Sequence, residues 1–290
     1  MTKERKMKNI NQYTTPIKPT FCPGCGNFGI MQAMKQAFDQ LKLPPEKIVI
    51  SYDVGCNANM ADFMNTYGFH GLHGRSVPPA VGVKLANHKL TCLALIGDGG
   101  FYGEGAQHFL SLMRGNHDIT VLVHDNQRYS LTTGQMSPTT PKGTITVSTP
   151  EGTIEEPINP LAVALVNHCT FVARGFAGDV LHLQDLIVKG IKHKGFSLIE
   201  ILQPCVIWNK ERSYEWYRER IYKLKKGKYI ANDRREALVK TKEEDKLAIG
   251  VFYQEEKKAY HEEVSSLLDL PLVEQPIEKI NIGKLLEEFK

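Results

Sequence analysis

The chain has 290 residues, of which 42% are hydrophobic and 23% are charged, and this length is enough to bury one large core. No apolar run approaches the ~20 residues that cross a bilayer, and the charged N-terminus lacks the apolar stretch of a secretion signal. The net charge of +4 is too small to indicate nucleic-acid binding on its own. We therefore expect a cytoplasmic globular protein that binds neither nucleic acid nor membrane.

The first elements alternate between helix and strand. Residues 1–20 are polar and contain proline, and we expect them to form an extended arm. The segment from Asn27 to Leu41 places apolar residues at helical spacing, which predicts an amphipathic helix. The β-branched run 47–53 predicts a buried strand, and residues 78–87 predict a second helix with proline in its first turn.

The clearest architectural signal lies in the middle of the chain. Apolar runs alternate there with helical segments, and this alternation indicates parallel strands joined by crossovers. The predicted segments are strand 91–97, helix 103–114, strand 118–125, strand 170–175, helix 180–193 and strand 196–202. We therefore predict an α/β fold with an open, mostly parallel sheet and helices on both faces.

Two segments lack this alternation. Residues 127–159 are rich in Thr, Pro and Gly, and a loop of this length is usually functional. Residues 206–290 are charged, and we expect them to be mainly helical, with one strand at 247–253. The predicted organisation is an N-terminal arm of residues 1–20, a cofactor domain of residues 21–208 and a C-terminal extension of residues 209–290.

Chemically suggestive residues follow four of the predicted strands. In an open parallel sheet, ligands bind beyond the carboxyl ends of the strands. The residues at these ends are Gly55-Cys56-Asn57, Gly97-Asp98-Gly99-Gly100, Asn126 and Pro204-Cys205. We expect all four groups to face the same crevice.

The Gly97–Gly100 turn and Asn126 predict a site for magnesium and a diphosphate. Glycines let the backbone turn tightly and approach a diphosphate, and the carboxylate of Asp98 suits Mg²⁺. Asn126 and the backbone carbonyl of Arg128 can add further oxygen ligands. A lone Gly-Asp-Gly is more often only a strand-to-helix turn. Because Asn126 follows one helix and one strand later, the pattern favours the metal–diphosphate site.

The cysteines suggest a second metal site. The turn Cys22-Pro23-Gly24-Cys25 presents two thiolates to one metal, and alone such a turn more often binds structural zinc than an iron–sulfur cluster. Zinc ribbons usually supply a second pair of this kind, and the sequence has none. With the single cysteines Cys56 and Cys205, four thiolates would satisfy a [4Fe–4S] cluster. We interpret Cys92 and Cys169 as small buried residues.

Several motifs together resemble one known family, the beta subunits of 2-oxoacid:ferredoxin oxidoreductases. The motifs are Cys22 to Gly26, Gly55-Cys56, Pro204-Cys205, His70-Gly71-Leu72-His73-Gly74-Arg75 and the run from Asp125 to Gln135. The resemblance covers roughly residues 15–210. The segment from Gly97 to Asn126 is similar to the motif of thiamine-diphosphate enzymes, which commonly ends in two asparagines. Here Asp125 precedes Asn126.

The resemblance implies thiamine diphosphate, Mg²⁺ and one [4Fe–4S] cluster as cofactors. It implies that Cys22, Cys25, Cys56 and Cys205 hold the cluster, and that Asp98, Asn126 and Arg128 hold Mg²⁺. The residues that we expect to contact the organic cofactor and its magnesium are Gly55, Asn57, His73, Arg75, Gly97, Asp98, Gly99, Gly100, Asn126, Arg128, Tyr129, Leu131 and Thr132.

Three of the polar residues can also be judged from their chemistry. His73 and Arg75 can each donate a charge-assisted hydrogen bond to a phosphate, although either can instead order a loop. In related chains the third residue after the Cys56 position is often basic and can meet a substrate carboxylate. Here that residue is Asn59, which weakens 2-oxoglutarate as the substrate and leaves pyruvate or a broad range of 2-oxoacids open.

The implied reaction is the oxidative decarboxylation of a 2-oxoacid with CoA to acyl-CoA and CO₂, with electrons passing through the cluster to ferredoxin. A glutamate that activates the cofactor normally lies on a separate domain in this class. Because the sequence has room for one cofactor domain, we expect an alpha subunit, or alpha and gamma subunits, as partner. Two alternatives stay open: a non-redox thiamine-diphosphate decarboxylase or carboligase subunit whose cysteine pair binds zinc, and a zinc-stabilised, non-catalytic scaffold.

The positive charge is uneven along the chain. Between Lys210 and Arg235, ten Lys and Arg residues stand against four Asp and Glu residues. Such a stretch is usually a solvated helix face. Alternatively, it steers acidic ferredoxin or anionic CoA towards the site.

Overall fold

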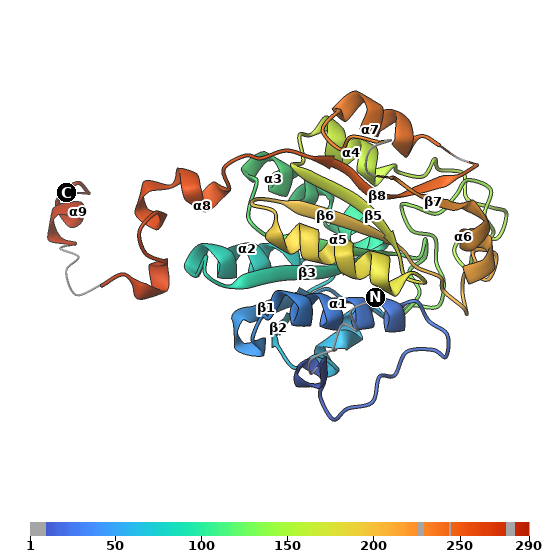
Figure 1. Cartoon of the computed structure of the whole chain (residues 1–290), viewed down its shortest axis with the longest axis horizontal. Helices are drawn as coiled ribbons and strands as arrows, with labels where there is room; N and C mark the ends of the chain where they lie inside the picture. Colours follow the sequence, from blue (N-terminus) through green and yellow to red (C-terminus); the bar gives the residue numbers. More distant parts are fainter. Residues whose placement is uncertain (1–9, 226–228, 244, 277–281, 290) are drawn as a thin grey trace, which may run out of the picture.

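A mixed sheet in the order β2-β1-β3-β4-β6-β5-β8-β7 forms the centre of the protein (Figure 1). The computed structural model describes residues 10–225, 229–243, 245–276 and 282–289. Within these ranges β1 to β6 are parallel, β8 is antiparallel to β5, and β7 is parallel to β8. The strands are β1 Ile48–Tyr52, β2 Tyr67–His70, β3 Thr91–Gly97, β4 Thr120–Asp125, β5 Phe171–Phe176, β6 Ser197–Leu202, β7 Ile221–Lys223 and β8 Leu247–Gln254.

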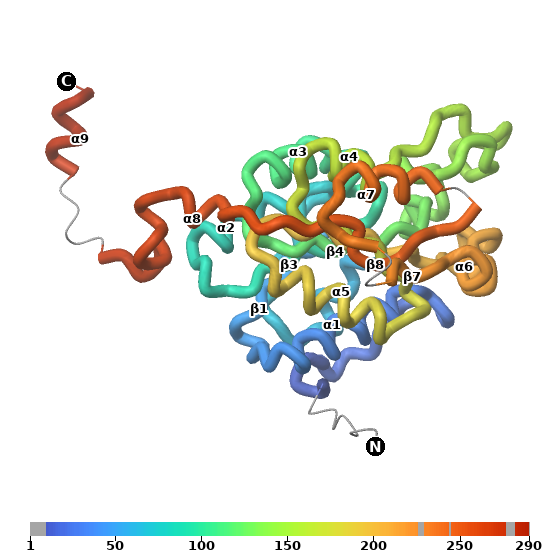
Figure 2. The backbone as a smooth tube through the Cα atoms, turned by 45° about the horizontal axis from the view of Figure 1, so that its top comes forward, coloured from blue at the N-terminus to red at the C-terminus, as the bar shows by residue number. Residues whose placement is uncertain are grey.

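Helices cover both faces of this sheet. One face packs against α1 and α5, and the other against α2, α3 and α4, with α7 beside α4 (Figures 1 and 2). The predicted α/β fold is confirmed. The helices are α1 Asn27–Leu41, α2 Val77–Ala86, α3 Ala106–Gly115, α4 Pro160–Val166, α5 Val180–Lys192, α6 Tyr214–Arg220, α7 Arg234–Thr241, α8 Tyr260–Glu263 and α9 Gly283–Glu287.

The helix α1 shows why the sequence folds in this way. Ile30, Met34 and Phe38 recur at helical spacing and are fully buried against the sheet. Burying each such side chain contributes roughly 1.5–3 kcal/mol. The helix ends at Leu41 because Lys42 adopts the left-handed conformation (φ 54°), and its N–H closes the last turn.

Several elements differ from the predictions. The helix predicted at 103–114 begins at Ala106, because Gly100–Glu104 forms a π-helical turn closed by the bond from Gly105 N–H to the carbonyl of Gly100. The strand β2 was not predicted, since its four residues are all exposed and show no alternation. The helix α4 was also missed, because it is only seven residues long and follows the long irregular loop.

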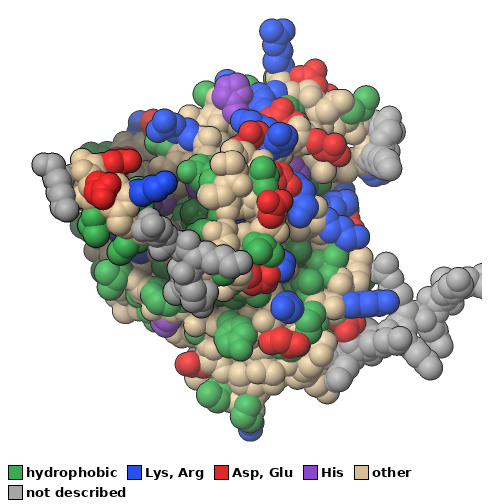
Figure 3. Space-filling model, turned by 90° about the vertical axis from the view of Figure 1, so that its left-hand side faces the viewer, with side chains coloured by type: hydrophobic (Ala, Val, Ile, Leu, Met, Phe, Trp, Pro, Cys, Tyr) green, Lys and Arg blue, Asp and Glu red, His purple; other side chains and the backbone are tan. Residues whose placement is uncertain are grey.

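The C-terminal part is less helical than predicted. The strand predicted at 247–253 is confirmed as β8, but β7 was not predicted, and both strands extend the central sheet. Short 3₁₀ turns also occur at Ser265–Leu267 and Leu272–Glu274. The helix α9 lies away from the sheet (Figure 2). On the face at this end of the protein, positive and negative side chains are intermixed (Figure 3).

The N-terminal arm packs on the body over its described part. Residues 1–9 of the predicted arm lie outside the described residues. Ile10–Tyr13 forms a 3₁₀ turn, and the fully buried Tyr13 donates a hydrogen bond to the carbonyl of Leu43. Further 3₁₀ turns are Pro45–Lys47 and Ala58–Asp62. In the part of the chain that the structure describes, no helix has the length and apolar character to cross a bilayer.

Candidate functional site

The carboxyl ends of β1, β3, β4 and β6 meet at one edge of the sheet, where they border a cleft of about 70 Å³. The structure therefore brings together the residues that follow these strands. The cleft is lined by Val54, Gly55, Cys56, Asn57, His73, Gly97, Asp98, Gly99, Gly100, Asn126, Arg128, Tyr129, Ser130, Leu131, Thr132 and Gln203.

Asp98 lies at the floor of the cleft. Its side chain is buried, and its Oδ2 accepts hydrogen bonds from Ser137 Oγ at 2.5 Å and Thr139 Oγ1 at 2.7 Å. Burial raises the pKa of Asp98 to about 6, although these hydrogen bonds oppose the shift. A cation beside this carboxylate would favour its charged form. Asp98 therefore fits the role of a magnesium ligand.

The glycines after Asp98 bring the backbone close to its neighbours. A Cβ atom on Gly99 would lie 2.3 Å from the ring of Tyr129, and one on Gly100 would lie 2.1 Å from Oδ2 of Asp53. Neither position has room for a side chain. The turn is therefore restricted to glycine, and it leaves backbone without side chains at the cleft.

Two asparagines contribute amide groups to the cleft. The Oδ1 of Asn126 accepts hydrogen bonds from Arg128 N–H and from Ser130 Oγ, each at 3.0 Å. The Nδ2 of Asn57 is buried and has no hydrogen-bond partner among the described residues. Since a buried donor without a partner is costly, Asn57 is suited to donate to an anionic ligand. These residues fit a magnesium–diphosphate group.

His73, Arg75 and Asn59 are placed differently. His73 lines the cleft, with Nδ1 3.3 Å from Oε2 of Glu104. Arg75 is not part of the lining; its guanidinium donates to the carbonyl of Glu104 at 3.2 Å and lies 2.7 Å from Nε2 of His108. Asn59 lies in the 3₁₀ turn Ala58–Asp62 and is also not part of the lining. The contacts of Arg75 agree with the loop-ordering alternative.

The turn from Cys22 to Cys25 lies against the end of β6. The N–H of Cys25 bonds to the carbonyl of Cys22, and Gly26 N–H bonds to the carbonyl of Pro204 at 3.2 Å. Gln203, which lines the cleft, donates to the Sγ of Cys25 at 3.6 Å. The cysteine turn therefore contacts a residue that lines the cleft, although Cys22 and Cys25 are not themselves part of the lining.

The four cysteines predicted as cluster ligands affect one another electrostatically. Burial first, and then negative charge on Cys25, Cys205 and Cys22, together raise the pKa of Cys56 to about 11. Within the described ranges, however, no three His, Cys, Asp or Glu side chains are arranged to hold a metal ion. The four thiols therefore match a cluster in donor type but not in their described arrangement, and their assignment as its ligands stays a prediction.

The other two cysteines are structural. Cys92 is buried within β3, and Cys169 is buried just before β5, where its thiol donates to the carbonyl of Phe171 at 3.3 Å. Both pack in the core cluster beneath α2, α3 and α4. These contacts agree with their interpretation as small buried residues.

Comparisons with known proteins decide the family. Residues 53–201 match the family described as thiamine pyrophosphate enzyme, C-terminal TPP binding domain, and residues 205–269 match the family described for the C terminal of the pyruvate ferredoxin oxidoreductase beta subunit. The chain is 43% identical over 256 residues to the 2-oxoacid:ferredoxin oxidoreductase subunit beta of Saccharolobus solfataricus, with 84% of each chain covered. The chain belongs to the beta subunits of the 2-oxoacid:ferredoxin oxidoreductases.

Two further similarities extend over almost the whole beta subunit. The 2-oxoacid:ferredoxin oxidoreductase subunit beta of a Sulfolobus species is 41% identical over 283 residues, covering 91% of this chain and 93% of that one. A solved 2-oxoglutarate:ferredoxin oxidoreductase from Magnetococcus marinus, with 2-oxoglutarate, coenzyme A and succinyl-CoA bound, has a TM-score of 0.89 at 28% identity. That similarity covers 99% of this chain and 98% of the other.

Several buried polar side chains lie behind the cleft in this beta subunit. Arg174 of β5 and Glu200 of β6 form an ion pair of 2.6 Å. Burial and the charges of Asp98 and Glu200 raise the pKa of Asp125 well above its ordinary value. The hydroxyl of Thr139 lies 2.9 Å from Oδ1 of Asp125. These buried polar side chains lie between the Asp98 end of the cleft and the core of the sheet.

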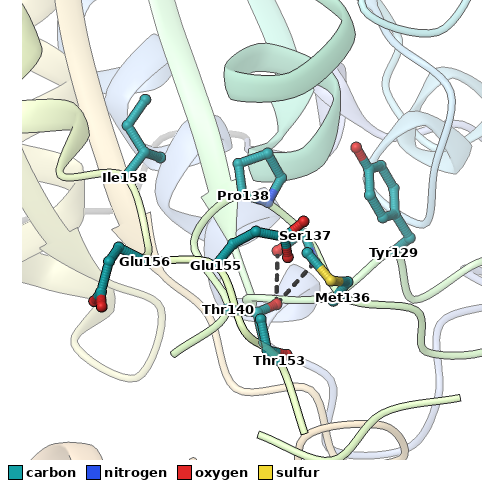
Figure 4. Close-up of a pocket in the computed structure, with 9 residues that line it drawn as sticks. All are labelled: Tyr129, Met136, Ser137, Pro138, Thr140, Thr153, Glu155, Glu156 and Ile158. Carbon is teal, nitrogen blue, oxygen red and sulfur yellow. Dashed lines mark hydrogen bonds between the residues drawn. The ribbon is translucent and has the colours of Figure 1, made fainter. Parts of the chain in front are cut away.

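The long loop 127–159 of the beta subunit encloses a second, larger cavity. It has a volume of about 550 Å³, and Tyr129 lines both this cavity and the first cleft. Figure 4 shows the residues that line the cavity. Its lining residues are Tyr129, Met136, Ser137, Pro138, Thr140, Thr153, Glu155, Glu156 and Ile158. The loop thus forms a wall of both spaces.

Several residues at the site were not predicted. Ser130 and Gln203 line the cleft, Ser137 and Thr139 hold Asp98, and Glu104 accepts a hydrogen bond from Tyr129 at 3.2 Å. Ser130 and Gln203 could have been predicted from the sequence, because each is adjacent to a predicted site residue or strand end. The positions of Ser137 and Thr139 depend on how the loop folds back, and the sequence of the loop has no periodic pattern from which its path could be predicted.

The basic stretch is largely occupied by contacts within the beta subunit. The guanidinium groups of Arg212 and Arg220 lie over the ring of Trp216, at 3.8 and 4.4 Å from its centroid. Lys223 pairs with Asp179 at 2.6 Å. Residues 226–228 of this stretch lie outside the described residues. These contacts support the interpretation of the stretch as a solvated face rather than as a surface that steers a partner.

Proposed function

We propose that this beta subunit, together with an alpha subunit, oxidatively decarboxylates a 2-oxoacid with CoA to acyl-CoA and CO₂, and that one [4Fe–4S] cluster passes the electrons to ferredoxin. The observation that carries this proposal is the position of Ser130. Its hydroxyl lies 3.0 Å from Oδ1 of Asn126 and 3.4 Å from Sγ of Cys205. One side chain therefore bridges the proposed magnesium site and the proposed cluster site, so that electrons have a short path between them.

The residues of the cleft suggest a division of roles. Asp98, Asn126 and the backbone carbonyl of Arg128 would hold Mg²⁺, and the Gly97–Gly100 turn would bind the diphosphate. Thiamine diphosphate, when bound, supplies an electron sink for decarboxylation. His73 and Asn57 would donate to phosphate oxygens, since both line the cleft.

The remaining lining residues complete the proposed cofactor site. Gly55 has φ of +148°, a backbone conformation that side chains disfavour, and it admits the cofactor beside Cys56. The proposed contacts beyond the diphosphate are Gly55, Tyr129, Leu131 and Thr132. Arg75 would act indirectly, by holding the backbone at Glu104.

The cleft also supports the need for a partner subunit. Its volume of about 70 Å³ is far below the roughly 300–1,000 Å³ of typical ligand pockets. Asp98 is the one carboxylate among the described lining residues, so the glutamate that activates the cofactor would come from the alpha subunit. Exposed apolar side chains on loop 127–159, which walls the cleft, are suited to receive that subunit: Leu131 (50% exposed), Ile145 (72%), Val147 (63%) and Ile154 (82%).

The substrate is proposed as a 2-oxoacid, and pyruvate and 2-oxoglutarate are the two to compare. The lack of a basic residue at Asn59 favours pyruvate or a broad range. The relatives at 41–43% identity are described by the general name 2-oxoacid:ferredoxin oxidoreductase.

The direct test is turnover by the purified alpha–beta complex with ferredoxin, CoA, and pyruvate or 2-oxoglutarate, under anaerobic conditions. We expect ferredoxin reduction and acyl-CoA formation that depend on CoA, on added thiamine diphosphate and on both subunits. Robust turnover by the beta subunit alone would refute the shared site. Carboligation or decarboxylation without ferredoxin reduction would favour the non-redox alternative.

A further inference from the structure

Two hydroxyl groups from the long loop 127–159 converge on one oxygen of Asp98. Ser137 Oγ donates to Oδ2 of Asp98 at 2.5 Å and Thr139 Oγ1 donates to the same atom at 2.7 Å. All three side chains are buried, with exposed fractions of 1% for Asp98, 2% for Ser137 and 5% for Thr139. Hydrogen bonds to a buried carboxylate are charge-assisted and strongly directional, so they fix the rotation of the carboxylate plane.

The two hydroxyls are themselves held in place by the loop. The N–H of Ser137 donates to Thr140 Oγ1 at 2.8 Å, and Thr140 Oγ1 donates to the carbonyl of Gln127 at 2.7 Å. Ile158 N–H donates to the carbonyl of Pro138 at 2.8 Å. The start, the middle and the end of the loop are thus tied together around Ser137, as Figure 4 shows for Ser137 and Thr140.

Thr139 has a second neighbour. Its hydroxyl lies 2.9 Å from Oδ1 of Asp125, which directly precedes the proposed magnesium ligand Asn126. Thr139 therefore spans the ends of β3 and β4, from which the two proposed side-chain ligands project. A shift of the loop would disturb both ligands together.

From this geometry we infer that Ser137 and Thr139 are positioning residues that orient Asp98 for Mg²⁺, so that loop 127–159 sets the magnesium affinity of the cofactor site. This inference rests on the proposed magnesium–thiamine diphosphate site and adds residues that do not touch the cofactor. Outer-shell partners of metal ligands typically change metal affinity by about 10–100-fold when they are removed.

The test measures thiamine diphosphate binding to the alpha–beta complex by calorimetry over a series of Mg²⁺ concentrations. We expect Ser137→Ala and Thr139→Val each to raise the half-saturating Mg²⁺ concentration about 10–100-fold. At saturating Mg²⁺ the affinity for thiamine diphosphate should return to that of the wild type, because the diphosphate contacts are intact. The conservative variant Thr139→Ser keeps the hydroxyl and should retain the wild-type magnesium dependence.

Thr153→Val is the matched control. Thr153 is buried in the same loop and lines the same cavity as Ser137, but its hydroxyl donates to the backbone carbonyl of Thr144 at 3.0 Å. A magnesium dependence unchanged in Ser137→Ala and Thr139→Val overturns the inference, and so does an equal shift in Thr153→Val. If the wild-type complex binds no thiamine diphosphate even at saturating Mg²⁺, the proposed function itself is wrong. If the wild type binds it and the variants behave like the wild type, only the inference about Ser137 and Thr139 is wrong.

Discussion

The hydroxyl of Ser130 lies 3.4 Å from the Sγ of Cys205, across the edge where β4 and β6 end. The same hydroxyl lies 3.0 Å from Oδ1 of Asn126. Because β4 and β6 are neighbours in the sheet, the residues that follow them are brought together even though they are distant in sequence. The side chains proposed to hold the cluster and those proposed to hold Mg²⁺ are nevertheless different residues, so we expect the two proposed sites to be removable one at a time.

Replacing Cys205 by Ser should remove the cluster and leave the organic cofactor bound. The hydroxyl of serine is a poor substitute for a thiolate ligand of iron. Iron and sulfide analysis of the anaerobic complex should show a large loss in Cys205→Ser, while calorimetric binding of thiamine diphosphate with Mg²⁺ stays near the wild-type value. Cys92→Ala serves as the control and should keep its iron. Unchanged iron in Cys205→Ser would show that this cysteine is not a ligand.

Replacing Asp98 by Asn should have the reverse effect. The change removes the buried carboxylate that is proposed to bind Mg²⁺, and removal of an outer-shell group alone costs about 10–100-fold in metal affinity. We therefore expect the magnesium affinity to fall at least about 100-fold, with the iron content unchanged. Calorimetry and iron analysis of the same preparation give both readings. Wild-type magnesium dependence in Asp98→Asn would contradict the assignment.

Gly99→Ala should destabilise the protein and weaken cofactor binding. Its Cβ would lie 2.3 Å from the ring of Tyr129, and overpacking of this kind typically costs about 1–3 kcal/mol in the free energy of unfolding. Gly82 in α2 is a matched control, since no heavy atom lies within 4 Å of its added Cβ. Gly82→Ala should stabilise by about 0.4–1 kcal/mol. Denaturant unfolding of both variants checks the contrast, and equal effects would show that the turn tolerates a side chain.

The path of the sheet was largely predictable from sequence, whereas the loop that completes the site was not. The run Asn27–Leu41 places its apolar residues at helical spacing, so this helix follows from a local rule. The strands β3, β4 and β6 are mainly apolar, as expected for strands buried on both faces. Their carboxyl ends therefore identified the glycine turn and Asn126.

Other features depend on contacts that are distant in sequence. The π-helical turn Gly100–Glu104 forms where Gly74 packs against Gly105 and Glu104, at 2.6–2.9 Å from an added Cβ. The antiparallel pairing of β8 with β5 joins residues 247–254 to strand 171–176, and the local sequence does not reveal this pairing. Ser137 and Thr139 reach Asp98 only because the loop folds back over the end of β3.

Replacing exposed apolar residues of loop 127–159 by charged ones should weaken assembly with the alpha subunit. Ile145 and Val147 of this loop are 72% and 63% exposed, and burying such side chains stabilises interfaces. We expect Ile145→Asp or Val147→Asp to weaken association at least about tenfold, which corresponds to about 1.4 kcal/mol. Val239→Asp, at an exposed position of α7, is the control and should assemble normally. Size-exclusion chromatography of co-expressed subunits measures the effect; full assembly of the loop variants would place the interface elsewhere.

The basic stretch should contribute little to ferredoxin reduction. Lys210 and Lys225 are exposed, whereas Arg212 and Arg220 pack on Trp216. Reversing the charge of both lysines to Glu should leave the salt dependence of ferredoxin reduction unchanged, since a solvated face does not steer a partner. A clear loss of salt dependence in Lys210→Glu/Lys225→Glu would instead establish electrostatic steering.

The most direct test of the central claim is the ultraviolet–visible spectrum of the anaerobically purified alpha–beta complex, recorded before and after addition of thiamine diphosphate, Mg²⁺, a 2-oxoacid and CoA. The expected result is a broad absorption near ~400 nm that is bleached by the substrates, as thiolate-bound iron and sulfide require. A colourless complex that contains stoichiometric zinc would contradict a redox centre beside Asn126 and Cys205.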